Sequence, residues 1–402
     1  MSPANEVLCV TRGVWRKYAH STSRYKLPWT HEQEDPTRAV PLWEATLKVV
    51  VRPCVNMDLE GLDRLRTLVY PHLPQAFDTD WNSSVWRWLG THPLADEMHR
   101  WVVATEEGEV VGHLAALPQF YRIGGQRVMA HTPADYQVLP QYGRHAVLLM
   151  RRLLGTAENC VACNTSSAVI DIATRLGTKE VGKLQYAAKV WNVAGIPGFL
   201  QSIPGPISQL LNLGLRAVDG VLSSTFLAND LKAEVIAGFD ASFDELFEVL
   251  AATIPCVPEK DAAFLRWRYG PGSPQASATL LGVRDGESLL GYAVLWVTRD
   301  GDDGYLLDLT TRPGRRDVVR SLLIEAVRLF RRAGVNSIRY QFLESPTSPQ
   351  RKDLWRLGFV LGNKRRSTML VKFGDQGLHR TALEPANWSY TTGDGDMTFW
   401  IR

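Results

Sequence analysis

Cysteine is scarce in this sequence, with five residues in a chain of 402. An odd number in a long chain makes no disulfide framework and favours a reducing compartment. Cys160 and Cys163 form a C-x-x-C pair, but no second pair and no nearby group of histidines completes a zinc site. The pair lies in a strand-like run, where the two sulfurs would not converge. We therefore expect buried structural thiols, no metal and a cytoplasmic location.

A strong charge bias and an unbroken apolar run are also missing. The net charge of +3 is too small for a dedicated duplex-DNA binder. Met1 to Asn5 is polar and leads into no apolar core, so we expect no signal peptide. The longest uncharged run, Val190 to Leu215, is broken by three prolines and four glycines, which argues against a spanning helix. It indicates a connector packed on protein, with a role at a lipid interface left open.

The composition is that of a globular protein of two or three domains, with 45% hydrophobic and 22% charged residues. Helix and strand signals follow an order that occurs twice. Each pass predicts a strand, two helices, a β-hairpin, a strand, a helix, a strand and a last helix. The first pass runs from about Thr46 to Gly177 and the second from about Lys232 to Phe359.

Equal spacings support a repeat. The landmarks are Trp86, Gly112 and Gly177 in the first pass and Trp267, Gly291 and Gly358 in the second. Their intervals are 26 and 65 residues in the first pass and 24 and 67 in the second. We infer a tandem duplication of one α/β unit. The predicted parts are an extended arm (1–45), a first unit (46–190), a Pro/Gly-rich apolar connector (191–230) and a second unit with C-terminal strands (231–402).

The first unit contains a strand that ends in Val138-Leu139-Pro140 and passes through a Gly and Arg turn into a helix. Such a turn directs backbone N–H groups and the positive end of a helix outward, which is a generic anion site. An ordinary strand-to-helix connection is the alternative. The second unit has a basic turn at the equivalent place, Arg312 to Arg316, and its last helix ends in Leu357-Gly358-Phe359.

This order of elements and these motifs resemble the acyl-CoA N-acyltransferases of the GNAT superfamily, in a tandem two-unit form. In that family V-x-P ends the fourth strand, a turn of the form R/Q-x-x-G-x-G/A follows, and L-Y-x-x-x-G-F often marks the last helix. The ending Asn387 to Asp396 also resembles bacterial two-unit proteins of the superfamily. The resemblance implies an α/β fold in which mixed, mostly antiparallel central sheets are flanked by helices.

The resemblance also implies a function. It is the transfer of an acyl group, most simply acetyl, from acetyl-CoA or another acyl-CoA to the amine of a small molecule or amino sugar. A Fem-like aminoacyl transferase is one alternative, although the helical coiled-coil insertion of those proteins is missing. A non-catalytic scaffold or binding protein with degenerate units is another. No nucleic-acid partner and no integral membrane span are expected, and a homodimer stays open.

The resemblance places acyl-CoA against the fourth strand and its turn. It assigns to the cofactor Gln137, Val138, Leu139, Gln141, Tyr142, Gly143, Arg144, His145 and Ala146. Arg144 departs from the family pattern, because a glycine would let the backbone approach a phosphate more closely. Arg144 and His145 offer side-chain contacts to phosphate instead. In the second unit Pro313 has no N–H to offer, so we favour the first unit as the cofactor site.

The resemblance further suggests candidates for the catalytic base, which in the family is commonly a carboxylate or a histidine acting through water. They are His131, Asp135, Tyr136 and Asn164. An exposed strand carboxylate and a surface histidine are the structural alternatives for Asp135 and His131. The family's usual acid is a tyrosine on the last helix, and Trp355 stands there in the second unit, so the acid is unassigned.

Aromatic residues with arginines between them occupy the second helix of each unit, where the family's acceptor cleft is often walled. The candidates are Trp86, Trp88, Trp267 and Tyr269. Such rings stack on a sugar, and the arginines between them hold an anionic acceptor. Core aromatics flanked by arginines that extend to solvent are the alternative. Asp308 and Glu344 are further candidate acceptor contacts in the second unit.

Overall fold

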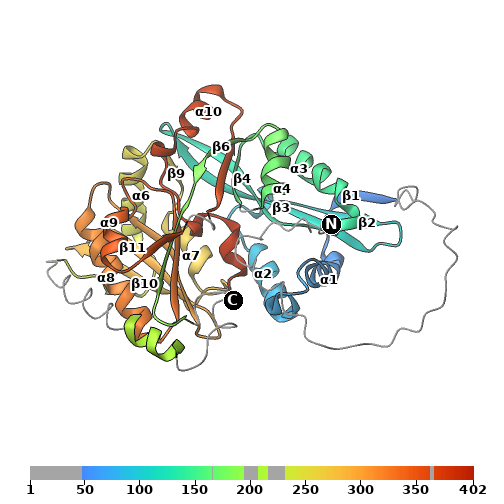
Figure 1. Ribbon diagram of the computed structural model, residues 1–402. Helices are drawn as coiled ribbons and strands as arrows, with labels where there is room; N and C mark the ends of the chain where they lie inside the picture. Colours follow the sequence, from blue (N-terminus) through green and yellow to red (C-terminus); the bar gives the residue numbers. More distant parts are fainter. Residues whose placement is uncertain (1–47, 165, 194–206, 216–230, 363–365) are drawn as a thin grey trace, which may run out of the picture.

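The computed structural model describes residues 48–164, 166–193, 207–215, 231–362 and 366–402. The predicted arm (1–45) and most of the predicted connector (191–230) lie outside these ranges. Within them the chain forms two mostly antiparallel sheets, each flanked by helices (Figure 1). The predicted mixed α/β fold is thereby confirmed.

The first sheet is built mainly from the first half of the chain. In spatial order its strands are β1 (Val49–Pro53), β2 (His99–Thr105), β3 (Val110–Ile123), β4 (Gln126–Val138), β5 (Cys160–Asn164), β15 (Thr368–Lys372) and β6 (Lys179–Lys183). A short strand, β9 (Cys256–Pro258), pairs with the far end of β3. All neighbouring strands of this sheet run antiparallel except β4 and β5, which run parallel.

The second sheet repeats this order. Its strands are β8 (Glu234–Val235), β10 (Thr279–Asp285), β11 (Ser288–Val297), β12 (Asp303–Thr311), β13 (Ser337–Phe342), β7 (Gln185–Val190) and β14 (Val360–Gly362). The parallel pair is again the fourth and fifth strand, β12 and β13. The two sheets therefore correspond strand by strand, which favours the predicted duplication.

Each sheet contains, within its strand order, one strand from the other half of the chain, and β9 from the second half is added at the end of β3. β7 inserts between β13 and β14, and β15 inserts between β5 and β6. The sequence pattern did not indicate this exchange, since both strands are short and carry no partner signal of their own. The exchange ties the C-terminal part of the chain into the first sheet.

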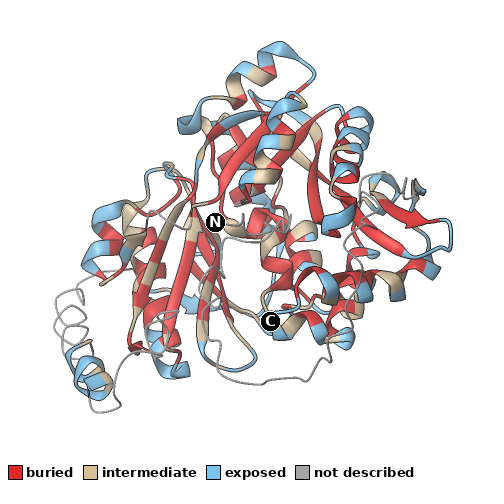
Figure 2. Ribbon diagram, turned by 45° about the vertical axis from the view of Figure 1, so that its right-hand side comes forward, coloured by how far each residue is buried: buried red, intermediate tan, exposed pale blue. Residues whose placement is uncertain are grey.

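Helices cover both faces of each sheet (Figure 1). Around the first sheet they are α1 (Leu59–Val69), α2 (Thr79–Leu89), α3 (Arg144–Thr156), α4 (Ser167–Arg175) and α10 (Gln376–Ala382). The others are α6 (Ala241–Thr253), α7 (Ala262–Tyr269), α8 (Arg316–Ala333) and α9 (Arg351–Arg356). Figure 2 shows buried residues filling the strands and exposed residues on the outer helix faces, the pattern of amphipathic helices on a buried sheet.

The two halves meet through α2 and α7. The rings of Trp88 and Trp267 stack with centroids 4.6 Å apart and planes 11° apart. Trp88 Nε1–H donates to the Trp267 carbonyl at 2.9 Å, and Trp267 Nε1–H donates to the Trp88 carbonyl at 3.4 Å. A reciprocal pair of this kind is what a twofold relation between similar units produces.

The C-terminal segment (385–402) crosses between the halves, and the C-terminus lies between them in Figure 1. It contains three short 3-10 helices, η7 (Pro385–Asn387), η8 (Thr392–Asp394) and η9 (Asp396–Trp400). η8 packs against β12 and η9 against β4. This segment therefore touches the fourth strand of both sheets.

The two cysteines of the C-x-x-C pair lie in β5, as the sequence predicts. Both are buried free thiols, and burial raises the pKa of Cys160 and of Cys163 to about 12. The prediction of buried structural thiols is confirmed. Among the described residues, no helix is long and apolar enough to cross a membrane.

Candidate active site

A gap opens in the first sheet where β4 and β5 diverge. The two strands pair at one position, His131 with Cys160, where His131 N–H donates to the Asn159 carbonyl at 2.9 Å. Beyond it β4 continues to pair with β3. Leu139 N–H donates to the Val111 carbonyl on the β3 side, so strand alternation turns Val138 N–H toward the gap. The gap is therefore lined on one side by backbone donors.

A bulge in β4 lies at the inner end of this gap. The β3–β4 register shifts between His113 and Ala115, opposite Asp135, which has a φ of +47°. It is the one non-glycine residue with a positive φ in the described part of the chain. A non-glycine residue with such a positive φ costs about 1–3 kcal/mol, and the conformation persists only where neighbouring groups hold it.

The neighbours that hold Asp135 are buried and charged. Its carboxylate accepts from Arg66 Nη1 at 2.9 Å, His113 Nδ1 at 2.9 Å and Gln137 Nε2 at 2.5 Å. Burial alone would raise the pKa of Asp135, but the hydrogen bond and charge of His113, together with Arg66, lower it below its usual value. These partners keep Asp135 ionised and occupied, which suits a residue that supports the bulge better than one that takes up a proton.

A second carboxyl group meets the bulge from the C-terminal segment. Asp135 N–H donates to Asp396 Oδ2 at 3.2 Å. Burial raises the pKa of Asp396 to about 7, and the charge of Asp135 adds to this while the hydrogen bond from Asp135 N–H opposes it. A carboxyl group that titrates near neutral pH is suited to general-base catalysis. The sequence analysis did not select Asp396; the acidic ending Asn387 to Asp396 was the available signal.

The other predicted catalytic residues lie around the gap. Tyr136 is buried, its hydroxyl donates to the Ala146 carbonyl at 2.5 Å, and burial raises its pKa. His131 is buried with Nε2 3.0 Å from the Glu97 carbonyl, and burial lowers its pKa. The Asn164 backbone pairs with Thr368, and its side chain lies outside the described residues. Tyr136 thus ties β4 to α3, and His131 marks the point where the strands diverge.

The chain enters α3 at the mouth of the gap through a 3-10 turn, η4 (Pro140–Tyr142). The N–H groups of Tyr142 and Gly143 donate to Leu139 and Pro140 carbonyls inside the turn. Ala146 N–H donates to the Gly143 carbonyl at 3.1 Å, so the first-turn donors of α3 left for an anion are those of Arg144 and His145. Gly143 has a φ of −51°, and Arg144 has no positive φ either. Arg144 is therefore exposed at the helix start without backbone strain, although the family pattern favours glycine.

Most of the predicted cofactor residues would offer backbone alone. Six of the nine are buried, and they are Gln137, Val138, Leu139, Tyr142, His145 and Ala146. His145 Nδ1 donates to the Tyr142 carbonyl at 3.2 Å, so this ring stabilises the turn and does not extend to solvent. Gln141 and Arg144 are exposed and are the side chains placed to meet a phosphate.

The equivalent gap of the second sheet is closed by the chain itself. β12 and β13 are paired from Asp303 to Leu306 on β12, and the C-terminal segment lies beside them beyond that point. Leu343 N–H donates to the Tyr390 carbonyl at 2.8 Å, and Phe342 bridges to Thr391. An extended ligand would have to displace this segment.

The second basic turn is partly engaged by contacts within the chain. Gly314 N–H donates to the Pro346 carbonyl at 3.1 Å. Arg315 forms an ion pair with Asp317 at 2.6 Å, and Arg316 shares Asp353 with Arg320. Two of the three arginines in this turn are therefore held by carboxylates, and the turn keeps a net positive charge.

A buried ionic cluster fixes the C-terminal segment in the second gap. Lys260 Nζ lies 3.1 Å from Asp308 Oδ2 and 3.2 Å from Asp394 Oδ1, and it donates to Thr310 Oγ1 at 3.1 Å. Burial would lower the pKa of Lys260, but the two carboxylates raise it. Burial raises the pKa of Asp394 to about 6, with Lys260 opposing and Asp308 adding to the shift. Asp308 therefore anchors this segment, and the cluster holds η8 two residues before Asp396.

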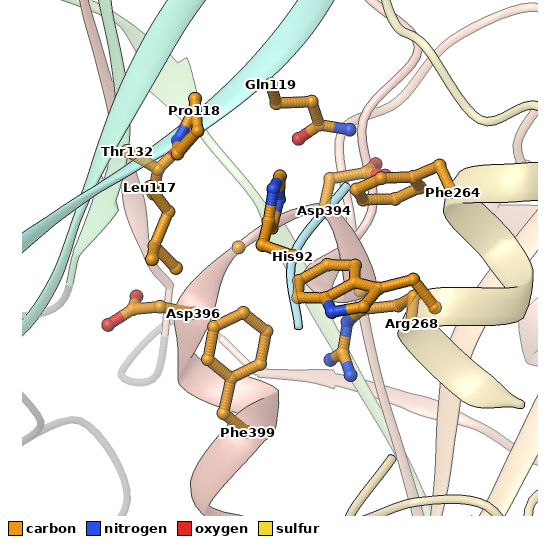
Figure 3. A pocket seen from close by; sticks show the side chains of 13 residues that line it. His92, Leu117, Pro118, Gln119, Thr132, Phe264, Arg268, Asp394, Asp396 and Phe399 are labelled. Carbon is orange, nitrogen blue, oxygen red and sulfur yellow. The ribbon is translucent and has the colours of Figure 1, made fainter. Parts of the chain in front are cut away.

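A small pocket with room for about one water molecule lies between the halves beside Asp396 (Figure 3). Its walls come from β3, β4, α7, the loop after α2 and the C-terminal segment. The residues that line it are His92, Leu117, Pro118, Gln119, Thr132, Phe264, Trp267, Arg268, Gly393, Asp394, Gly395, Asp396 and Phe399. Asp396 lines this pocket and also meets the β4 bulge at the inner end of the gap.

One of the four predicted acceptor residues, Trp267, lines this pocket. Trp86, Trp88 and Tyr269 are buried in the core instead. Trp86 packs against His113 and Trp400, while Trp88 packs against Trp267 and Phe399. The structure therefore uses these three rings to hold the two halves and the C-terminal segment together, and the pocket wall was only partly predictable from helix position.

The fold is similar to that of solved GCN5-related N-acetyltransferases and of N-myristoyltransferase, which is the fold of the GNAT superfamily. No family sequence model and no curated protein sequence matches the chain.

Solved structures similar to this one include N-myristoyltransferase from Saccharomyces cerevisiae with bound myristoyl-CoA, at a TM-score of 0.55 and 11% identity over 81% of this chain and 78% of that one. A GCN5-related N-acetyltransferase from Anabaena variabilis has a TM-score of 0.52 and 13% identity over 82% of this chain and 73% of that one. A putative acetyltransferase from Pyrococcus horikoshii has a TM-score of 0.50 and 12% identity over 90% of this chain and 97% of that one. At these identities the likeness establishes the fold alone.

Proposed function

We propose that this protein is an acyl-CoA-dependent N-acyltransferase that acts at the inner end of the gap between β4 and β5. The observation that carries the proposal is the meeting of the β4 bulge with Asp396. There a backbone N–H holds a carboxyl group with a pKa of about 7 beside a pocket. The acceptor is an amine on a small molecule or amino sugar.

The residues present fit an acyl-CoA in the first half. Gap-facing donors such as Val138 N–H suit an extended ligand along β4, and the start of α3 with Arg144 suits its phosphates. When bound, acyl-CoA supplies the acyl group as a reactive thioester. The second half serves to hold the C-terminal segment, through the buried cluster of Lys260, Asp308 and Asp394.

The side chains then have distinct tasks in the transfer. Ionised Asp396 accepts a proton from the acceptor amine as its nitrogen forms the new C–N bond, and the C–S bond breaks. Backbone N–H groups of β4 donate toward the oxygen on which negative charge develops. The proton passes to the departing thiolate through Asp396 or solvent, which balances the step. Asp135, Arg66 and His113 keep the bulge in place.

Acyl-CoA should stabilise the full chain against heat. A ligand at 100 times its Kd adds about 2.7 kcal/mol to the free energy of unfolding, which a melting-temperature scan with acetyl-CoA and longer acyl-CoAs would detect. Arg144→Glu should abolish the shift, because it places a negative charge at the start of α3. Arg315→Glu is the matched control and should keep the shift.

Two outcomes would contradict this assignment. No shift with any acyl-CoA would reject the enzyme and leave the non-catalytic scaffold. Loss of the shift in Arg315→Glu, with Arg144→Glu unaffected, would move the cofactor to the second half.

A further inference from the structure

A helical segment, 207–215, presents its apolar side chains to solvent. Ile207, Leu210, Leu211 and Leu213 are between 40% and 69% exposed. The segment lies at the outer edge of the second half, drawn in yellow-green near the bottom of Figure 1. A helix that packs on a protein core buries its apolar residues, so this segment has the opposite arrangement.

A polar side chain holds this segment on the protein. Asn212 Oδ1 accepts Val193 N–H at 2.8 Å, and Asn212 Nδ2 donates to Asn192 Oδ1 at 2.9 Å. Asn192 N–H in turn donates to the Asn336 carbonyl at 3.2 Å, shortly after the end of α8. The asparagine therefore faces the second half, and the exposed leucines around it face away.

The sequence around this segment is poor in charge. Between Trp191 and Asn229 the charged residues are Arg216 and Asp219, whereas 22% of the whole chain is charged. A surface helix that contacts only water carries polar and charged residues on its outer face. Residues 207–215 include no charged residue, so their outer face suits an apolar partner.

Charges of both signs lie near the place where the segment is held. Arg331 and Arg332 are exposed in the last turn of α8. Asp300 and Asp302 are exposed in the turn before β12, and Asp302 accepts from Asn336 Nδ2 at 2.8 Å. With the signs balanced, the leucines and not a net charge must supply most of the attraction to a partner.

The size of the apolar face favours a lipid surface over a second copy of the chain. Four partly exposed aliphatic side chains present less than the about 800 Å² that each partner buries in a stable protein interface. A lipid surface does not require such an area, because each side chain that leaves water for the acyl region contributes by itself. Exposed arginines beside the face can contact phosphate groups of the lipids.

We propose that residues 207–215 dock the protein reversibly on the surface of a phospholipid bilayer. Leu210 and Leu213 enter the acyl region, and Asn212 stays on the protein side. A face of this size gives reversible binding, as a single lipid chain does. The segment shares no residue with the gap or with Asp396, so the docking does not depend on the proposed acyl transfer.

Sedimentation of the full chain with vesicles tests the proposal. Wild type should pellet with phosphatidylcholine vesicles. Vesicles of equal parts phosphatidylcholine and phosphatidylglycerol should change its partition coefficient by less than about tenfold, because the leucines dominate. Leu210→Ser with Leu213→Ser should lower the partition coefficient at least about tenfold, since two apolar side chains no longer leave water. Leu68→Ser with Leu148→Ser, at two exposed leucines of the first half, is the matched control and should bind as wild type does.

Three results would overturn the proposal. The first is wild type that stays in the supernatant with both kinds of vesicle. The second is binding that the Leu210 and Leu213 double variant retains, which would place the lipid contact elsewhere. The third is a melting temperature without lipid that falls much further in this variant than in the control, because that would show the two leucines to be covered by the chain itself.

Sedimentation velocity without lipid separates this proposal from contact between two copies of the chain. Wild type and the Leu210 and Leu213 double variant should have the same oligomeric state. An oligomer of wild type that the double variant dissociates would overturn the lipid assignment in favour of a second copy. These measurements need no acyl-CoA, so a failure of the proposed acyl transfer leaves their outcome unchanged.

Discussion

Replacing Asp396 with asparagine should lower kcat/KM for acyl transfer by roughly 10²–10⁴-fold, the usual contribution of a positioned general base. Asparagine has nearly the same shape and can still accept the Asp135 N–H, so the C-terminal segment should stay in place. It cannot take a proton. The measurement is steady-state kinetics with acetyl-CoA and the best amine, beside the melting-temperature shift with acetyl-CoA, which should persist.

The pH dependence of kcat/KM tests the same role of Asp396 as the base. Asp396 has a pKa of about 7, and only its ionised form accepts a proton, so wild-type kcat/KM should fall about tenfold per pH unit below about pH 7. The groups around it are Asp135, Arg66, His113 and Asp394. Asp171→Asn, an exposed change on α4, should keep both the rate and the profile. A flat wild-type profile down to about pH 5 would remove Asp396 from the reaction.

Stability should move in the opposite direction to activity. The folded pKa of Asp396, about 7, lies above its unfolded value near 4, so the folded state binds this proton more tightly. The contribution of the protonated Asp396 carboxyl group to the free energy of unfolding is complete below about pH 4, and it is lost as the pH rises through about 7. Asparagine does not ionise, so at about pH 8 the variant should be more stable than wild type by roughly 2–4 kcal/mol. Urea unfolding at both pH values measures the difference, and a variant less stable at pH 8 would contradict it.

The sequence was sufficient to predict the strand, the turn and the helix around the candidate site. Period-2 and helical patterns around Val138 to Leu149 predicted the strand, the turn and the helix, because each is set by local residues. The same holds for β5 and for the two passes of elements. Arg144 departs from the family pattern, and the structure shows that the backbone itself needs no glycine there, since the turn uses right-handed backbone.

The sequence was insufficient for contacts between distant residues. Asp135 and Asp396 are separated by 261 positions, and the strand exchange that brings them together depends on β7 and β15. The hydrophobic pattern of a short strand does not indicate which strand it pairs with, so the places of β7 and β15 in the sheets were not predictable. Helix position suggested Trp86 and Trp88 as pocket walls, but burial between two packed halves depends on the partner surface, which one helix does not reveal.

Loss of the Lys260 charge should be the most damaging change to the fold outside the aromatic core. Lys260→Met would leave Asp308 and Asp394 buried and facing each other, and removing one partner of a buried ion pair typically costs about 3–5 kcal/mol. Without the cation the two carboxyl groups would hold a proton more tightly, so the destabilisation should be smaller at about pH 5 and larger at about pH 8.

Urea unfolding at these two pH values measures the cost, and Lys352→Met, at an exposed lysine on α9, is the matched control. Adding Asp308→Asn to Lys260→Met should recover part of the stability, because it removes one of the two facing charges. Because the cluster holds η8 two residues before Asp396, Lys260→Met should also lower acyl transfer at pH values where the chain is still folded. If Lys260→Met were as stable as wild type at about pH 8, or if it lost stability without losing activity, the second half would not be the anchor of the catalytic carboxyl group.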